Sequence, residues 1–205
     1  ALAEVAKLLV GVDPELAQST ARRAKDASDS PAVQEAADDA LAGVDALADY
    51  VMVWQVSGPY FKQGLEAKDL FDERFPAESI APEEDVDWSP IGAMTKLGKP
   101  WLVDLREALG GDDRVAYLRT NVFSPRDQDV RAELGSDDAV KMWVNGVLEH
   151  ALLVSRGATP GEDVIPIRLY AGWNSILLKI VQGKVDWGAV LRLVQEDGSR
   201  IEGIR

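Results

Sequence analysis

The chain has 205 residues, of which 46% are apolar, and it contains one His and no Cys. With 35 acidic and 22 basic side chains its formal net charge is −13, which argues against nucleic acid or an anionic membrane surface as a partner, because both bind clustered Lys and Arg. The lack of Cys excludes disulfides and thiolate metal sites, and the lone His150 excludes multi-His sites. No apolar run approaches the roughly 18–20 residues of a membrane helix, so we expect no membrane insertion.

The N-terminal residues 1–48 are predicted to be helical. Apolar side chains recur at helical spacing over residues 2–9, and two further helices are expected to begin at Asp13-Pro14 and Ser30-Pro31, because a capping side chain followed by Pro is a helix start signal. These Ala-rich helices resemble the end of a HEAT-type repeat array. The other interpretation is a helical cap on the domain that follows.

Composition and pattern both change near residue 49. Residues 1–49 hold 10 acidic and 4 basic side chains, whereas residues 111–205 hold 14 and 12, and all six Trp lie at or after Trp54. The helical spacing also gives way to the alternation that is typical of strands. We therefore predict a helical region over 1–48 and a β-sandwich domain over 49–205, with a long excursion at about 60–110.

Alternating apolar and polar residues predict strands through most of the second region. Asn145-Gly146 is a strong hairpin signal, because both central positions of a type I′ turn need positive φ. Eight or nine short strands at this spacing indicate an all-β sandwich. Several strands are apolar on both faces, so we expect part of the sandwich to be covered, with the helical region as the candidate cover. The expected strands are 50–56, 114–123, 127–134, 139–144, 147–154, 163–170, 174–182 and 187–195, with a last short strand near Ile201.

One stretch resembles a known family. The string Gly135-Ser136-Asp137-Asp138, followed by Trp143-Val144-Asn145-Gly146, looks like the hairpin of galactose-binding-like jelly rolls, and Gly172-Trp173-Asn174 and Leu177-Leu178-Lys179 continue the pattern. The Ser-Asp-Asp element is also similar to the sugar-binding sandwich of protective-antigen type. The resemblance implies a mainly β fold, a jelly-roll or galactose-binding-like β-sandwich with a small N-terminal α-helical region. It also implies an ancillary carbohydrate-binding module of a larger bacterial protein that is secreted, periplasmic or associated with the cell envelope.

The predicted strands offer a candidate carbohydrate-binding surface. A sugar needs an aromatic ring against the apolar side of its pyranose and planar polar groups for its hydroxyls. Alternation puts Trp143 and Lys141 on one face of their strand and Tyr117, Arg119 and Asn121 on one face of theirs. If both strands belong to one sheet, these side chains form a single platform, and we expect Arg156, in the loop after the hairpin, to reach its rim.

The same residues also have a structural interpretation. Trp143 packs beneath the helical region or the excursion in that case, and Lys141 is simply solvated. We interpret four other Trp residues as core or turn anchors, namely Trp54, Trp101, Trp173 and Trp187.

Asp137 and Asp138 have two interpretations. In adhesin-type sandwiches a similar Asp pair helps to hold a calcium ion that ligates sugar hydroxyls, so the resemblance implies calcium at this position. In the alternative, Ser136 and Asp137 cap a turn through bonds from side chain to backbone. No other cofactor is expected.

The expected function is therefore a non-catalytic module that binds a polysaccharide or oligosaccharide and contacts neighbouring domains of the same polypeptide. Two alternatives stay open: a structural or protein-interaction module without a sugar ligand, and a glycan-active enzyme that uses paired carboxylates. The sequence has no G-x-S-x-G nucleophile motif and no nucleotide-binding loop. Because the chain opens on Ala1 rather than Met, we expect it to be a piece of a longer protein whose export signal lies outside this sequence.

Overall fold

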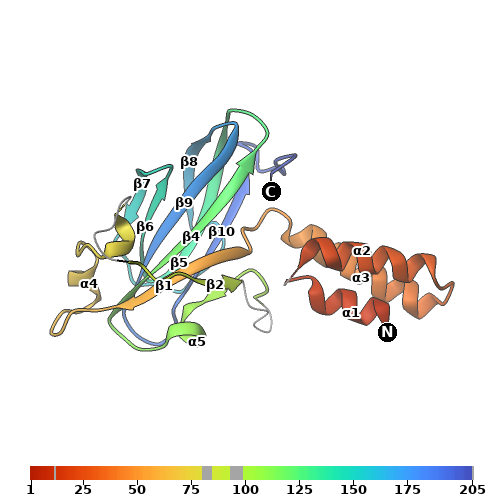
Figure 1. Ribbon diagram of the computed structural model, residues 1–205, viewed down its shortest axis with the longest axis horizontal. Helices are drawn as coiled ribbons and strands as arrows, with labels where there is room; N and C mark the ends of the chain where they lie inside the picture. The colour runs from red at the N-terminus through yellow and green to blue at the C-terminus, as the bar shows by residue number, and fades with distance from the viewer. Residues whose placement is uncertain (12, 80–84, 93–98, 205) are drawn as a thin grey trace.

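The computed structural model describes residues 1–11, 13–79, 85–92 and 99–204. Three helices come first and a sandwich of two antiparallel β-sheets follows (Figure 1). The prediction of a mainly β sandwich with a small N-terminal helical region is confirmed. The three helices are α1 (Leu2–Leu9), α2 (Pro14–Asp26) and α3 (Pro31–Leu47).

The helices pack against one another along a seam of small side chains. Asp13 caps α2 as the sequence predicts, its carboxylate accepting a hydrogen bond from the Leu16 amide at 2.9 Å, whereas Ser30 precedes α3 without a side-chain cap bond. Assignment of these helices to a HEAT array stays a prediction. Among the described residues, no helix combines the length and the apolar character needed to span a membrane. The buried seam consists of Ala3, Ala6, Ala21, Ala24, Ala36, Ala37 and Ala40.

The sandwich consists of a six-stranded sheet in the order β2-β1-β4-β9-β6-β7 and a four-stranded sheet in the order β3-β10-β5-β8. The longest pairing joins β4 to β9 over eleven residue pairs in the centre of the six-stranded sheet. The strands are β1 (Val53–Tyr60), β2 (Ser89–Gly92), β3 (Val103–Asp104), β4 (Arg114–Ser124), β5 (Gln128–Asp137), β6 (Ala139–Val144), β7 (Val147–Leu152), β8 (Asp163–Leu169), β9 (Gly172–Gln182) and β10 (Gly188–Val194).

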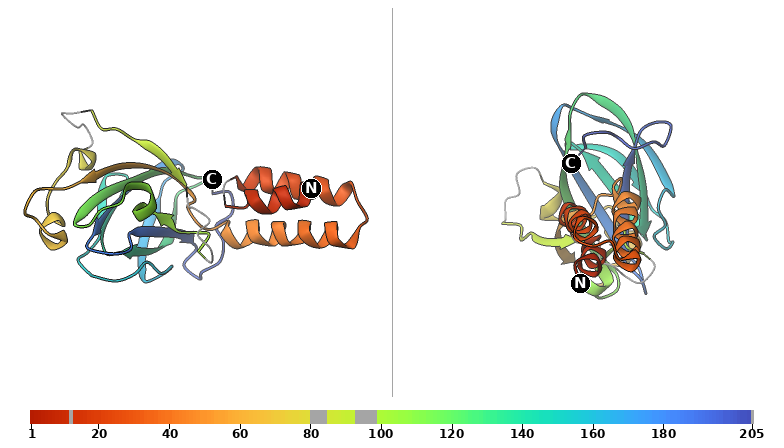
Figure 2. Two further views of the ribbon diagram at one scale, coloured as in Figure 1. Left: turned by 90° about the horizontal axis from the view of Figure 1, so that it is seen from below. Right: turned by 90° about the vertical axis from the view of Figure 1, so that its right-hand side faces the viewer.

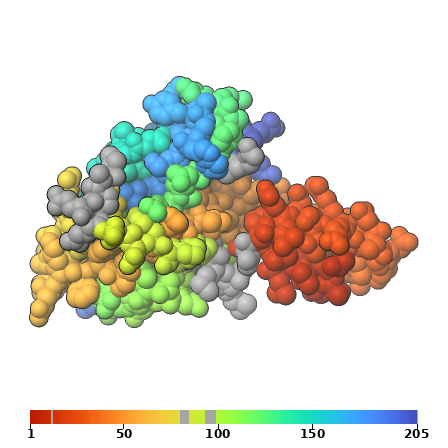
Figure 3. All heavy atoms as spheres, viewed as in Figure 1, coloured from red at the N-terminus to blue at the C-terminus, as the bar shows by residue number. Residues whose placement is uncertain are grey.

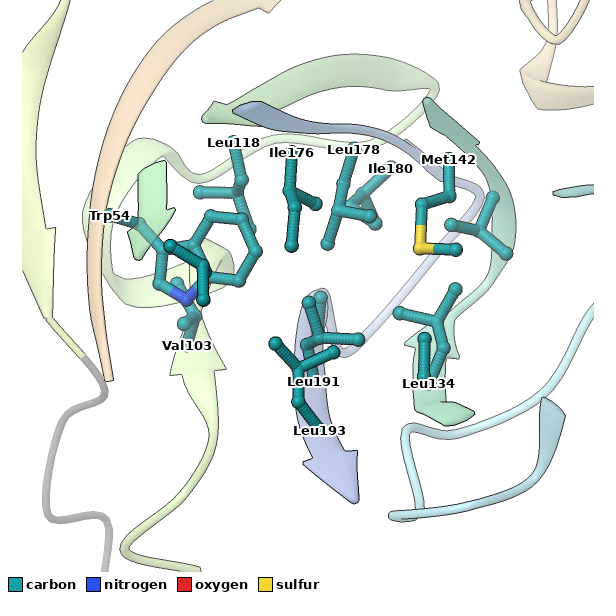
Figure 4. Packing of buried hydrophobic residues seen from close by; sticks show 14 of the residues in the cluster. Trp54, Val103, Leu118, Leu134, Met142, Ile176, Leu178, Ile180, Leu191 and Leu193 are labelled. Atoms are coloured by element: carbon teal, nitrogen blue, oxygen red, sulfur yellow. The ribbon is translucent and has the colours of Figure 1, made fainter. Parts of the chain in front are cut away.

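The main core lies between the two sheets, where side chains of both point toward one another (Figure 4). Alternation along each strand sends every second residue inward, so the core is built from the i, i+2 positions of the central strands. Trp54 is buried at one end and donates its indole N–H to the Val51 carbonyl at 2.8 Å. The six-stranded sheet contributes Leu118, Met142, Ile176, Leu178 and Ile180, and the four-stranded sheet contributes Leu134, Leu191 and Leu193.

Two details of the sequence-based expectation were wrong. The helices do not cover a face of the sandwich, because they project beyond one end of it (Figure 2). Cover comes instead from the excursion, which contains α4 (Ala67–Leu70), a single 3₁₀ turn at Pro76–Glu78 and α5 (Leu105–Leu109), besides β2 and β3. Near the C-terminus, Ile201 is buried but lies outside any strand, and only an isolated bridge joins Val194 to Arg200.

The connection between α3 and β1 is tied to the sandwich. The Val51 amide donates to the Leu191 carbonyl and the Leu193 amide donates to the Asp49 carbonyl, both at 2.9 Å, so the connection runs alongside β10. The Asp49 carboxylate pairs with Arg192 at 3.3 Å and with Arg200 at 3.1 Å. The base of the helical region is therefore held by the last strand and by the residues that follow it.

The close approach of the loop before β8 to β5 generates a prediction about stability. A Cβ atom on Gly135 would lie 2.0 Å from the Thr159 carbonyl oxygen, whereas one on Gly92 would lie 3.7 Å from its nearest neighbour, the Met52 carbonyl oxygen. We expect Gly135→Ala to lower the free energy of unfolding by about 1–3 kcal/mol or more, because backbone must move to make room. Urea denaturation measures this, with Gly92→Ala as the control, and equal stability of the two variants would contradict the packing described.

Candidate functional site

The outer face of the six-stranded sheet is divided into a covered half and an open half. Residues 61–79, here called the covering segment, pack against one half and form a second apolar cluster there. Leu70 and Phe71 of this segment are buried against Val115, Tyr117 and Val181 of the sheet. This cluster explains why β4 and β9 carry apolar residues on both faces.

A polar group lies in the middle of that apolar contact. The Tyr117 hydroxyl donates to Glu78 Oε1 at 2.6 Å, and Lys179 Nζ donates to the same oxygen at 2.9 Å and to the Glu73 carbonyl. Tyr117 and Lys179 are fully buried. Burial, with the hydrogen bond to Glu78 next, raises the pKa of Tyr117 above its usual range, and burial lowers the pKa of Lys179 against the opposing effect of Glu78. We call Glu78, Tyr117 and Lys179 the Glu78 clamp.

Lys141 is also held by the covering segment. Its Nζ donates to Asp72 Oδ1 at 2.8 Å and lies 4.3 Å from the centre of the Phe71 ring, and the bond from Lys141 lowers the pKa of Asp72. The expected platform is corrected at these two positions: Tyr117 and Lys141 do share its face, but the covering segment lies over them. Tyr117 is fully buried and offers no surface to a ligand, and the Lys141 side chain is only 15% exposed with its ammonium group bound to Asp72.

The open half of the face carries three of the predicted residues, Trp143, Arg119 and Asn121. In the space-filling view of Figure 3, atoms of β4 and β9, in green and blue, reach the surface above the yellow-green residues 85–92. Pairing places Trp143, Leu177 and Arg119 side by side on three neighbouring strands, with Trp143 half-buried and Arg119 exposed. Along β4, the exposed Asn121 follows on the same side, opposite Ser175.

Two hollows border the 3₁₀ turn on this half. One, of about 360 Å³, is lined by Trp88, Arg119 and Asn121, and the other, of about 590 Å³, is lined by Trp143 and by polar groups that include Arg74 and Asn145. Both hollows share Ala77, Ser79, Ser175 and Leu177 as lining residues, so they adjoin.

Arg119 is oriented by its neighbours in the first hollow. Its Nε donates to Gln55 Oε1 at 2.7 Å, and its guanidinium lies 4.1 Å from the centre of the Trp88 ring. Partial burial lowers the pKa of Arg119. This contact leaves the terminal guanidinium nitrogens without a hydrogen bond inside the described part of the chain, so they remain as donors for a ligand.

Arg156 lies elsewhere, which corrects its expected place at the rim of the platform. Its guanidinium bonds to Asp163 and to the Ser136 carbonyl, and it lines neither hollow. The hydrogen bond to Asp163 raises the pKa of Arg156. Burial is the largest single effect on Asp163 and would raise its pKa, but Arg156 and His150 together lower it below its usual range. His150 Nε2 lies 3.3 Å from the same carboxylate. Arg156 therefore joins β5 to the segment before β8 rather than facing a ligand.

The Asp pair at the end of β5 is asymmetric. The Asp138 carboxylate accepts three hydrogen bonds of 2.9 Å, from the Ser155 hydroxyl and from the amides of Arg156 and Gly183. These bonds occupy three of the roughly four acceptor positions of the Asp138 carboxylate, and a calcium ion at the Asp pair stays a prediction. Within the described ranges, no group of three or more His, Cys or acidic side chains is placed to hold a metal ion.

Asp137 faces a different environment. It is 8% exposed and lines a hollow of about 280 Å³ at one end of the sandwich, together with Asp186, Trp187 and Lys99. Burial, followed by the charges of Asp138 and Asp186, raises the pKa of Asp137 to about 6. Within the described residues the Asp137 carboxylate accepts no hydrogen bond, so nothing there supports the turn-capping alternative for Asp137. Ser136, by contrast, does donate to the Asp138 carbonyl at 2.6 Å.

Sequence analysis missed Glu78, Trp88 and Lys179. A single Lys inside the apolar run Ile176 to Val181 is a signal of a buried ion pair, because an isolated charge would not be retained there. No comparable signal marks Glu78 or Trp88, which lie in the excursion without a repeating pattern.

No protein-family model matches the chain, and no curated protein matches it significantly. Similar solved structures include the PA14 domain of the antifreeze protein MpAFP, which is 14% identical with a TM-score of 0.42 over 72% of this chain and 83% of that one. A family 35 carbohydrate-binding module from an environmental isolate is 16% identical with a TM-score of 0.33, over 44% of this chain and 69% of that one. An anti-sigma factor domain-containing protein is 17% identical with a TM-score of 0.44 over 73% of this chain, which spans only 44% of that protein. At these values the similarities assign no function to this chain.

The Glu78 clamp generates a second prediction. Replacing Glu78 by Gln leaves Lys179 buried without a counter-charge, so we expect Glu78→Gln to lower the free energy of unfolding by about 3–5 kcal/mol. The double variant Glu78→Gln with Lys179→Met removes both charges and should recover part of this loss. Tyr117→Phe, which removes one hydrogen bond, should cost only about 1 kcal/mol. Urea denaturation provides the measurement, and a loss in Glu78→Gln no larger than that in Tyr117→Phe would contradict the ion pair.

Asp137 generates a third prediction. Because its folded-state pKa of about 6 lies above the ordinary Asp pKa of 3.8, the folded protein binds more protons between these values. The Asp137 contribution to stability is therefore greatest below pH 3.8 and is lost as the pH rises through 6. We expect Asp137→Asn to raise the free energy of unfolding at pH 7.5 by on the order of 1–3 kcal/mol and to give no gain at pH 4. The exposed Glu149→Gln is the control, and an equal gain at both pH values would show that the effect is not electrostatic.

Proposed function

We propose that this domain binds carbohydrate on the open half of the outer face and does so without catalysis. The observation that carries the proposal is the position of Trp143, a half-buried indole that lines the hollow of about 590 Å³ beside Leu177. An indole held in this way presents a flat apolar surface to one side of a pyranose ring. Lys141 of the same strand is bound by Asp72 and Phe71 of the covering segment, whereas Trp143 lines the hollow.

The polar side chains around Trp143 suit hydroxyl groups. The Asn121 side chain is exposed and makes no hydrogen bond within the described residues, so its amide group offers both donors and an acceptor. Ser175 lies opposite Asn121, and the terminal nitrogens of Arg119 lie in the same row as Leu177. A small number of oriented polar groups beside an apolar surface is the usual composition of a small-molecule site. Of the six residues predicted for the site, Trp143, Arg119 and Asn121 are retained in this proposal.

The wider setting is part of the same proposal. We place the module in a larger bacterial polypeptide that is secreted, periplasmic or associated with the envelope, where its neighbours along the chain are its protein partners. Support for a neighbour comes from α1, whose Leu2, Val5 and Leu8 are exposed at helical spacing. If the domain binds no sugar, these residues favour the alternative of a protein-interaction module.

The fourth prediction tests carbohydrate binding directly. We expect the wild-type chain to bind in affinity electrophoresis through gels that contain xylan, mannan, β-glucan or pectin, and Trp143→Ala to weaken that binding ten-fold or more, which corresponds to about 1.4 kcal/mol. Tyr117→Phe is the matched control, because it alters an aromatic residue of the same face that is buried beneath the covering segment. Its binding should equal that of the wild type.

Three results would contradict the proposal in different ways. If the wild type bound none of these polysaccharides, the proposed function would be wrong. If Trp143→Ala bound as well as the wild type, the proposed site would be wrong. Release of reducing ends from a bound polysaccharide would show catalysis and would point to the Asp137 and Asp186 carboxylates of the smaller hollow instead.

A further inference from the structure

Trp173 is an exposed aromatic residue that the fold does not require. Its side chain is 67% exposed, although it belongs to the central strand β9 and lies on the outer face of the six-stranded sheet. A core or turn anchor, as the sequence predicted, would be buried. A Trp that leaves most of its ring in water gives up the stabilisation that burial would provide, so its position calls for another explanation.

The Trp173 ring is held in place by its surroundings. It packs edge-on against Phe123, its pairing partner on β4, with 5.5 Å between ring centres and 71° between planes. The next residue, Asn174, is fully buried and fixes the turn before β9, since its side chain accepts from the Tyr170 amide and donates to the Tyr170 carbonyl, both at 2.8 Å. A ring fixed in this way loses little conformational entropy when a ligand stacks on it.

Trp173 and Trp143 lie on the same open half-face but far apart. Trp143 pairs with Leu177, which is four residues along β9 from Trp173, so the two indoles are separated by about 13 Å along the strands and by about 5 Å across them. Ser175 and Asn121 lie in the row between. One pyranose, whose apolar side is about as large as one indole, cannot contact both rings.

We propose that the carbohydrate is an extended chain of sugars that lies along β9, and that Trp173 is a second stacking subsite for it. The inference rests on the proposed function, and it names the class of ligand: an oligosaccharide or polysaccharide long enough to reach from Trp143 to Trp173. Trp143 on β6 and Trp173 on β9 lie on either side of the polar row of Ser175 and Asn121, so separate sugar units of one chain can stack on the two rings while hydroxyls between them bond to the polar row. A protein partner would call for a continuous apolar patch at the centre of its interface, whereas here the centre is polar.

Affinity as a function of chain length tests this inference. The probes are gluco-, xylo- and manno-oligosaccharides with β-1,4 linkages, from the monosaccharide to the hexasaccharide, measured by titration calorimetry on the full chain. Wild-type affinity should rise with length until the oligosaccharide spans both indoles. Trp173→Ala should bind short members within two-fold of the wild type but lose the gain at the longest, ten-fold or more.

Control variants separate the subsite from effects on folding. Trp173→Tyr keeps a stacking ring and should retain most of the gain with length. Tyr170→Ala removes a different exposed aromatic ring beside the same turn, outside the open half-face, and should behave as the wild type. Trp143→Ala should lose affinity at every length.

Three outcomes would overturn the inference. Wild-type affinity that does not rise with length, or an equal rise in Trp173→Ala, would show that Trp173 is no subsite. Equal loss by Trp173→Ala at every length would show that it acts through the fold. Failure of the proposed function is distinguishable from all three, because the wild type would then bind no member of the series, and the inference would fall with it.

Discussion

Glu78 determines which part of the sheet is open to solvent. Its carboxylate is shared by a hydroxyl and an ammonium group that are both fully buried on the sheet, and it reaches them from the covering segment. Removal of a charged group from water costs free energy that its partner only partly returns. Such a pair therefore adds little to the free energy of unfolding, but it fixes the positions of its two groups. A shifted covering segment would leave Lys179 without its counter-charge. This penalty keeps the segment over one half of the outer face and off the other.

The division of the face in turn selects the candidate site. Tyr117 and Arg119 are two residues apart on β4 and share a face, yet one is buried and the other is exposed. On β6, Lys141 and Trp143 are both half-buried, but Lys141 is bound to Asp72 of the covering segment whereas Trp143 lines a hollow. Without the covering segment all four would belong to one surface, as the alternation alone suggested. The candidate site is thus the part of the outer face that the covering segment borders but does not cover.

Sequence pattern could predict the strands and their faces, because alternation is local and each strand of the sandwich has an inner side. It placed Trp143 with Lys141 and Arg119 with Tyr117 correctly for that reason. It could not place the covering segment, because the contact from Glu78 to Lys179 joins residues 101 positions apart. Nothing in the sequence around either residue indicates the other as its partner. The role of Asp138 was hidden for the same reason, since its three donors, Ser155, Arg156 and Gly183, come from two distant loops.

The ion pair between Asp49 and Arg200 restrains the connection before β1, so this connection does not act as a free hinge. Arg200 bonds to Asp49 and to Asp45, at the end of α3, across about 150 positions of the chain. Swinging the helices would break these ion pairs together with the backbone bonds to β10. These contacts therefore favour a single orientation of the helices relative to the open half of the sheet, so the helices set the direction in which that surface faces.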